Sequence, residues 1–169
     1  MSVNEARAIV TRMPEKPKDI ELIATHHEAG RDYFVLETVE AGIVLVGCEV
    51  KSLRDKKVNL QGSFAHLENN EVFLYHLYIA PYEMGNRENP EPLRKRKLLL
   101  KRSQIQKLLV KTQEKGLALI PLKLYFKHGL AKVELAVGKG KKLWDKRSDI
   151  KKRSADREIA RAIKNRNRK

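Results

Sequence analysis

Cysteine, aromatic residues and long apolar runs are all scarce in this chain. Its one cysteine, Cys48, cannot form an intramolecular disulfide or a cysteine-based zinc site, so the sequence favours a reducing compartment. The apolar run 43–46 is far too short to cross a bilayer. Asn4, Glu5 and Arg7 interrupt any apolar leader at the N-terminus. We therefore expect a soluble protein of the cytoplasm.

The patterns that indicate catalysis are also missing. The histidines show no metal-ligand spacing with acidic residues, and no nucleophile has an evident base beside it. The glycine- and lysine-containing run 138–142 lacks the spacing of a phosphate-binding loop. Glu40 and Asp145 are the only carboxylates that we would test for chemistry on RNA. We expect no enzyme, no metal site and no cofactor.

Positive charge, by contrast, is abundant and concentrated near the C-terminus. Residues 138–169 contain 14 Lys and Arg against 4 Asp and Glu, so they hold +10 of the net charge of +15. Such a segment attracts a polyanion, and contact with RNA or DNA releases condensed counterions. The alternative is a solubilising tail without a specific ligand.

The apolar pattern between the two ends is mainly that of β-strands. Residues 1–19 contain two prolines and no sustained period, which predicts a flexible arm. Three antiparallel hairpins are predicted from β-rich runs that flank short turns: 33–36 with 43–46 around 40–42, 64–67 with 72–75 around Asn69-Asn70, and 122–127 with 131–137 around His128-Gly129. In the third hairpin, core-facing residues alternate with a lysine-bearing face.

Two helices are predicted between the hairpins, at 49–56 and 104–115. Ser103 and Gln106 match a capping box at the start of the second helix, and Gly116 suits the position after its end. The glycine- and proline-containing segment 82–96 is predicted to be a loop.

These elements predict a mainly β protein with a few helices. We expect a small OB-like antiparallel β-barrel with flanking helices and a basic C-terminal tail, an architecture that often presents nucleic-acid surfaces. The predicted boundaries are a flexible arm at 1–19, a barrel at 20–138 and a tail at 139–169.

The start of the tail is suited to an RNA backbone. Lys139, Lys141 and Lys142 supply mobile cations, and the glycines between them let main-chain N–H groups approach phosphates. Trp144 either stacks on an unpaired base, which would contribute roughly 1–3 kcal/mol, or anchors the tail to the barrel. Asp145 is either part of the contact surface or an ion-pair partner within the tail.

Farther along, Ile159, Ala162 and Ile163 form a narrow apolar stripe on a helix that Lys and Arg otherwise cover. So few apolar residues do not stabilise an isolated helix. We therefore predict that the tail is disordered in the free protein and helical on an anionic surface.

Four segments together carry a family pattern. The sequences E-A-G-I at 40–43, E-V-K-S-L-R at 49–54, R-K-L-L-L at 96–100 and G-K-G-K-K-x-x-D-K-R at 138–147 occur in that order. They resemble the SsrA-binding protein family, also called small protein B. The resemblance spans about residues 33–152. It implies an RNA-binding protein that binds the tRNA-like domain of transfer-messenger RNA (tmRNA, or SsrA RNA) and delivers it to stalled ribosomes for trans-translation and ribosome rescue.

The resemblance also implies roles for individual residues. The tmRNA-binding residues would be Glu40, Leu99, Lys132, Lys139, Lys141 and Lys142. The residues meeting the decoding region of the small ribosomal subunit would be Trp144, Asp145, Lys146, Arg147 and Lys151. The tail helix, with Ile159, Ala162 and Ile163, would occupy the empty mRNA channel. The protein would act as a monomer and would not bind a membrane.

Two positions depart from the family pattern. His26-His27-Glu28-Ala29 stands where the family has an asparagine and basic residues, so the residues leave open whether His26 replaces an RNA-contacting asparagine. Trp144 stands where His or Tyr is common.

From its residues alone, the chain is a small basic β protein that binds structured RNA. A structural ribosomal or ribosome-assembly protein with a basic extension remains the alternative.

Overall fold

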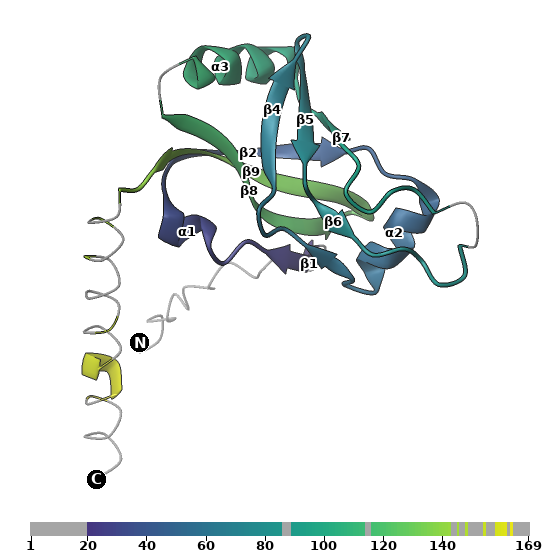
Figure 1. Ribbon diagram of the computed structural model, residues 1–169, viewed down its shortest axis with the longest axis horizontal. Helices are drawn as coiled ribbons and strands as arrows, with labels where there is room; N and C mark the ends of the chain where they lie inside the picture. The colour runs from purple at the N-terminus through teal and green to yellow at the C-terminus, as the bar shows by residue number, and fades with distance from the viewer. Residues whose placement is uncertain are drawn as a thin grey trace, which may run out of the picture.

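The computed structural model describes residues 20–85, 89–113 and 116–142, and within the tail residues 145, 148, 154, 158–161 and 163. Strands predominate among them, which confirms the mainly β class (Figure 1). The predicted arm at 1–19 lies outside the described residues. The elements in chain order are β1 (Ile20–Thr25), α1 (Ala29–Asp32), β2 (Tyr33–Ile43), α2 (Gly47–Arg54), β3 (Val58–Asn59), β4 (Phe64–Glu68), β5 (Glu71–Tyr75), β6 (Tyr78–Ile79), β7 (Arg96–Leu99), α3 (Arg102–Thr112), β8 (Leu117–Lys127) and β9 (Leu130–Gly140).

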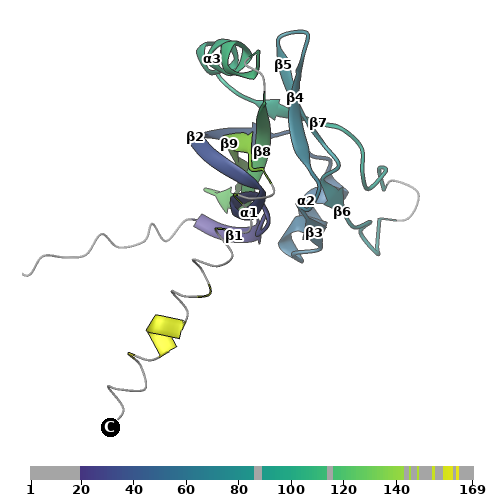
Figure 2. The ribbon, with the colours of Figure 1, turned by 60° about the vertical axis from the view of Figure 1, so that its left-hand side comes forward.

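The main sheet closes on itself. Its strand order is β1-β8-β4-β5-β7-β2-β9, and β8 also pairs with β9, so the strands from β8 round to β9 form a ring. β1 lies outside the ring and pairs with residues 123–127 of β8. Figure 2 shows β2, β8 and β9 as one wall, with β4, β5 and β7 opposite. Closure agrees with the predicted barrel, and the more specific OB-like assignment stays a prediction.

Leucine and valine side chains fill the interior of the ring. On β9, Val133, Leu135 and Val137 are buried, while Lys132 and Glu134 alternate with them on the outer side. Leu53 of α2 and Leu108 of α3 join this core from outside the sheet. The alternation places the charged residues of β9 on the surface, as the sequence predicted.

Two of the three predicted hairpins are confirmed. Asn69 and Asn70 have φ values of 49° and 60° between β4 and β5. His128 and Gly129 have φ values of 51° and 75° between β8 and β9. Consecutive positive φ angles are what a tight two-residue turn needs. The strands β8 and β9 are both longer than the predicted runs.

The first predicted hairpin is wrong. β2 continues from Tyr33 to Ile43 straight through the expected turn at 40–42. A Cβ atom on Gly42 would lie 3.2 Å from the Cβ of Leu99, so this glycine allows β7 to approach closely rather than the chain to turn. Residues 44–46 lead into α2 instead of forming a return strand.

Both predicted helices exist, and each begins two residues earlier than expected. The predicted capping box of Ser103 and Gln106 is wrong, because Gln104 takes this role: its Oε1 accepts a hydrogen bond of 2.9 Å from the Lys101 amide. α3 ends at Thr112 with Gln113 as its C-cap, three residues before the predicted end, so Gly116, with φ of 87°, is not the residue directly after the helix cap as predicted. None of the described helices has the length and apolar character needed to span a membrane.

Candidate nucleic-acid interface

The outer side of the β2–β9 wall brings three of the predicted RNA-binding residues together. Gly42 of β2 pairs with Lys132 of β9 on one side and with Leu99 of β7 on the other. Cross-strand partners point to the same face of a sheet, and so does Glu40, two residues from Gly42. Leu99 is 54% exposed although it is a leucine. We call Glu40, Leu99, Lys132 and their neighbours Tyr125 and Lys127 the β2–β9 patch.

Glu40 is the centre of the hydrogen bonding in this patch. Its Oε2 accepts bonds from the Tyr125 hydroxyl at 2.7 Å and from Lys127 Nζ at 3.0 Å, and its Oε1 lies 3.9 Å from Lys132 Nζ. The bond from Tyr125 and then that from Lys127 hold the pKa of Glu40 below its ordinary value. Burial, followed by the bond to Glu40, raises the pKa of Tyr125. One carboxylate therefore holds two surface lysines and the hydroxyl of Tyr125, whose side chain is otherwise buried.

The remaining predicted lysines form a second group at the far end of β9. Lys139 pairs with Phe34 of β2. Lys141 Nζ donates to the Gly30 carbonyl at 2.9 Å and lies 4.6 Å from the centre of the Phe34 ring. The Lys142 amide donates to Asp145 Oδ2 at 3.1 Å. Lys132 and Lys139 lie seven positions apart on β9, roughly 23 Å, and this odd spacing points their side chains to opposite faces of the strand, so the six predicted residues form two groups rather than one.

Most of the residues predicted to meet the decoding region lie outside the described residues, namely Trp144, Lys146, Arg147 and Lys151, as does Ala162 of the tail stripe. The described tail residues have helical backbone, and Ile159 and Ile163 are exposed. The roles assigned to these positions stay predictions.

Sequence reasoning missed three residues that the geometry adds to these groups, Tyr125, Lys127 and Phe34. The signal for the first two was present, because the His128-Gly129 turn sets the register that pairs Tyr125 with Lys132. Phe34 gave no such signal, since an aromatic residue in a strand is usually expected in the core.

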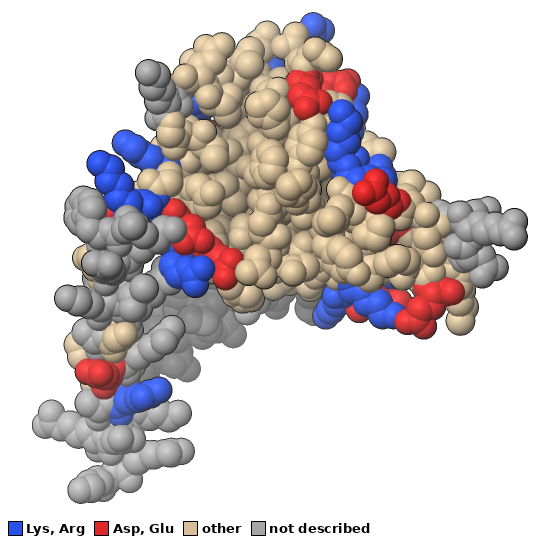
Figure 3. Space-filling model, in the orientation of Figure 1, with Lys and Arg blue, Asp and Glu red and all other residues tan. Residues whose placement is uncertain are grey.

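Charged side chains lie mainly around the edges of the opposite face, as Figure 3 shows from the side of β4 and β5. Lys95 and Lys97 on this side pair with Glu68 and Glu71. In the described part of the chain, no cluster of His, Cys, Asp and Glu could hold a metal ion. The cations near Glu40 and near Phe34 are thus the two groups best placed for a polyanion.

Comparison with known proteins gives a consistent result. The SmpB protein family model matches residues 23–165. The SsrA-binding protein of Desulforudis audaxviator (strain MP104C) is 57% identical over 155 residues, 92% of this chain and 98% of that protein. The SsrA-binding protein of Geobacillus sp. (strain WCH70) is 59% identical over 145 residues, 86% of this chain and 94% of the relative.

A solved structure described as "tmRNA-SmpB: a journey to the center of the bacterial ribosome" contains a chain that is similar in fold. It matches with a TM-score of 0.63 at 50% identity, over 75% of this chain and 93% of that one. The family match covers nearly all of the described residues, and the relatives are matched over almost their full length. The chain therefore belongs to the SmpB family of SsrA-binding proteins.

Proposed function

We propose that this chain is an RNA-binding factor that binds the tRNA-like domain of tmRNA and delivers it to stalled ribosomes for trans-translation. It acts without enzymatic activity or a cofactor, as a monomer in the cytoplasm. The relatives' name, SsrA-binding protein, and the tmRNA-SmpB structure support this proposal. The observation that carries it is the convergence of Glu40, Leu99 and Lys132, distant in sequence, on one outer face.

The β2–β9 patch supplies contacts suited to folded RNA. A-form helices are recognised by shape, phosphates and 2′-hydroxyl groups rather than by base sequence. Lys127 and Lys132 neutralise phosphates, while Glu40 keeps both ammonium groups in place and accepts hydrogen bonds from ribose hydroxyls. Leu99 adds apolar contact with the sugars.

The second lysine group fixes the orientation of the RNA. Lys139, Lys141 and Lys142 contact phosphates roughly 23 Å from the first group, a spacing set by the rise of β9. Two separated contacts on a rigid strand select an RNA of matching shape. A single cluster of cations would bind any polyanion.

The tail recognises the ribosome. Trp144, Asp145, Lys146, Arg147 and Lys151 meet the decoding region, and the helix that contains Ile159, Ala162 and Ile163 occupies the empty mRNA channel. About 20 helical residues extend roughly 30 Å. The tail therefore reaches a part of the mRNA channel well away from the barrel, where it detects whether mRNA is absent.

Truncation after residue 144 tests this division between barrel and tail. The truncated protein should bind the tRNA-like domain with nearly the affinity of the full chain, yet tagging on stalled ribosomes should be abolished. Lys57→Ala is a matched control, since Lys57 pairs with Glu83 away from both lysine groups, and it should behave like the full chain. Loss of RNA binding on truncation would contradict the division.

A competition experiment tests the RNA itself. The full chain should prefer the tRNA-like domain over random-sequence RNA of equal length. No preference, together with stable co-purification with non-stalled ribosomal subunits, would contradict the proposal and favour a structural ribosomal protein.

A further inference from the structure

A groove of about 630 Å³ lies beside the second lysine group. Residues of α1, β4, α3 and the first half of β8 line it, and Figure 1 shows α3 above this region, α1 below and β4 beside it. Its volume is within the range of roughly 300–1,000 Å³ that small-molecule sites occupy. The two lysine groups do not include any of its lining residues.

Aromatic rings are unusually frequent in the walls of the groove. Tyr33, Phe64, His26 and His66 supply four rings among its 17 lining residues, in a chain of 169 residues with 10 Phe, Trp and Tyr and 5 His. Phe64 is 42% exposed, and its ring stacks on that of Tyr75 with 5.4 Å between centres and 13° between planes. The ring of Phe64 is therefore held in place while much of it stays accessible. Fixed, accessible rings are what proteins use to stack on unpaired bases.

The charges of the groove favour a base over a phosphate. Glu28 and Asp32 line it, and Arg31 lies between them, 3.3 Å from the first carboxylate and 3.6 Å from the second. None of the described residues that line the groove is a lysine or an arginine. Carboxylates accept hydrogen bonds from the N–H groups of bases, the N3–H of uracil included, whereas they repel phosphates.

Phosphate-binding groups lie immediately outside. Tyr33 lines the groove, while the next residue, Phe34, contacts Lys141 and pairs with Lys139. Tyr33 itself pairs with Gly140, the residue between the two lysines. Because consecutive strand residues point to opposite faces, a nucleotide whose base enters the groove beside Tyr33 would pass its backbone around this strand end to bring a phosphate near Lys139 or Lys141.

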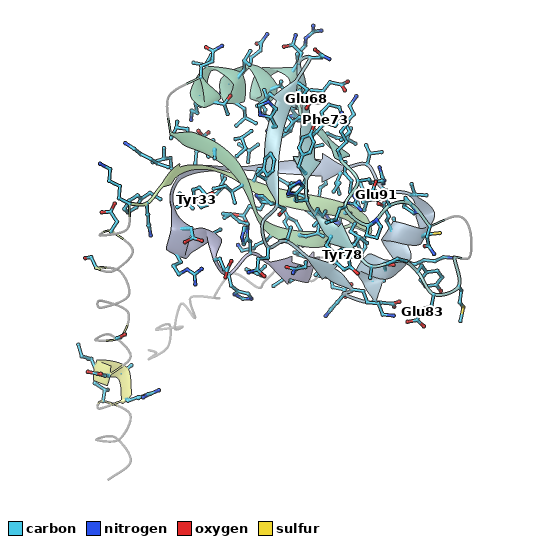
Figure 4. The ribbon with its side chains drawn as sticks, viewed as in Figure 1. Tyr33, Glu68, Phe73, Tyr78, Glu83 and Glu91 are labelled. Carbon is cyan, nitrogen blue, oxygen red and sulfur yellow. The ribbon has the colours of Figure 1, made fainter. Side chains whose placement is uncertain are left out.

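Gly138 explains how Tyr33 reaches this position. A Cβ atom there would lie 2.9 Å from Cδ1 of Ile120 and 3.2 Å from the Cβ of Tyr33. Because Gly138 has no side chain, Tyr33 and Ile120 both lie close against its backbone at the wall of the groove. Figure 4 shows Tyr33 at the start of β2 near α1.

We propose that this groove binds an unpaired nucleobase of RNA, stacked on Tyr33 and Phe64, while Lys139 and Lys141 hold the adjoining phosphates. The inference rests on the proposed function and adds to it a contact with single-stranded RNA. It makes the second lysine group part of a nucleotide site rather than a general cation cluster.

Two single strands test the site on the full chain: a short oligouridine and an abasic ribose-phosphate strand of the same length. Phe64→Leu and Tyr33→Leu keep an apolar side chain but remove the ring. Each should weaken binding of oligouridine by about 5- to 150-fold, as the loss of one stacked base implies, and leave the abasic strand unchanged. Lys139→Ala should weaken both strands equally.

Tyr78→Leu is the matched control, because Tyr78 is an exposed tyrosine of β6 outside the groove (Figure 4). It should change neither affinity. Thiouridine-substituted strands should crosslink to segments 26–33 and 63–67. Crosslinks confined to 130–142, or ring variants that weaken both strands equally or neither, would overturn the proposal.

The tRNA-like domain is measured with the same variants to separate this proposal from the proposed function. If the unaltered chain prefers that domain but does not distinguish oligouridine from the abasic strand, only the groove assignment fails. If the unaltered chain shows no preference for the domain, the proposed function fails whatever the groove binds.

Discussion

Two glutamates in this protein have similar partners in very different surroundings. Glu40 is 38% exposed and accepts hydrogen bonds from Tyr125 and Lys127 on the outer face of the wall. Glu49 of α2 is 3% exposed and accepts bonds from the side chains of Arg94 and Arg96, both at 2.9 Å from its Oε1. The same chemistry thus lies on the surface at Glu40, where we propose that it serves RNA recognition, and in the interior at Glu49, where it stabilises the fold.

The buried cluster closes the segment between β6 and β7 onto α2. Arg96 is 0% exposed, and its guanidinium also donates to the carbonyls of Leu77 at 2.6 Å, Pro92 at 3.0 Å and Arg94 at 3.1 Å. Burying such charges costs several kcal/mol for each ion unless their hydrogen bonds are satisfied. Here the donors of Arg96 converge on a carboxylate and three carbonyls, so Leu77, Pro92 and Arg94 are held against α2.

The largest effect is expected from breaking the buried pair. Glu49→Ala leaves Arg96 charged without its carboxylate, which should lower the free energy of unfolding by about 3–5 kcal/mol. Glu40→Ala removes an exposed partner and should lower it by less than about 1 kcal/mol. Urea denaturation of both variants measures the difference, and equal losses would contradict the contrast drawn between the two sites.

Acid should weaken the buried ion pair between Glu49 and Arg96. Burial alone would raise the pKa of Glu49, but bonds from Arg94 and the Val46 amide and the charge of Arg96 hold it below the ordinary value of 4.5. Ionised Glu49 therefore stabilises the fold fully above that pH, and the contribution disappears as pH falls through the lowered pKa. In urea denaturation, the stability gap between the native chain and Glu49→Gln should narrow on acidification; a constant gap would contradict this.

Neutralising single surface lysines should show whether they contact RNA phosphates, through the salt dependence of binding. Lys132→Ala and Lys139→Ala should each reduce the slope of log affinity for the tRNA-like domain against log salt by about 0.7 to 0.9. Lys57→Ala removes the same charge away from both groups and should leave the slope unaltered. Equal slopes in all three variants would mean that Lys132 and Lys139 only solvate the surface.

The smallest effect is expected from Tyr125→Phe, which removes only the hydroxyl that donates to Glu40. Because this bond lies within the protein, its loss should lower the free energy of unfolding by no more than the roughly 1 kcal/mol expected for Glu40→Ala. The pKa of Glu40 should move up toward its ordinary value, because the Tyr125 bond is the main cause of its lowering. Titration of the Glu40 carboxyl by NMR measures this shift, and an unmoved pKa would assign the lowering to the lysines.

Short sequence patterns predicted the features that neighbouring residues determine, namely the tight turns and the register of the strands beside them. The hairpins at Asn69-Asn70 and His128-Gly129 were found because tight turns need residues that tolerate positive φ. The register of the second hairpin then follows from alternation, and with it the outward direction of Lys132. The fold class and part of the interface were therefore readable from short stretches of sequence.

Contacts between distant segments were not readable in this way. Gly42 was taken for a turn residue because nothing local shows that β7 packs against it through Leu99. Glu49 is one of several charges on a helix, and its burial depends on Arg94 and Arg96, more than 40 residues away. The groove near Tyr33 likewise exists only once α1, β4, α3 and β8 have assembled.

The two-residue turn at His128-Gly129 sets the register of β9 against β8, and with it the side chains that face outward. Strand side chains repeat every second residue, so a single residue inserted into that turn would shift β9 by one position. Lys132 would then point inward and Val133 outward along the whole wall. The length of this one turn therefore sets which side chains of β9 form the surface, including side chains far from the turn.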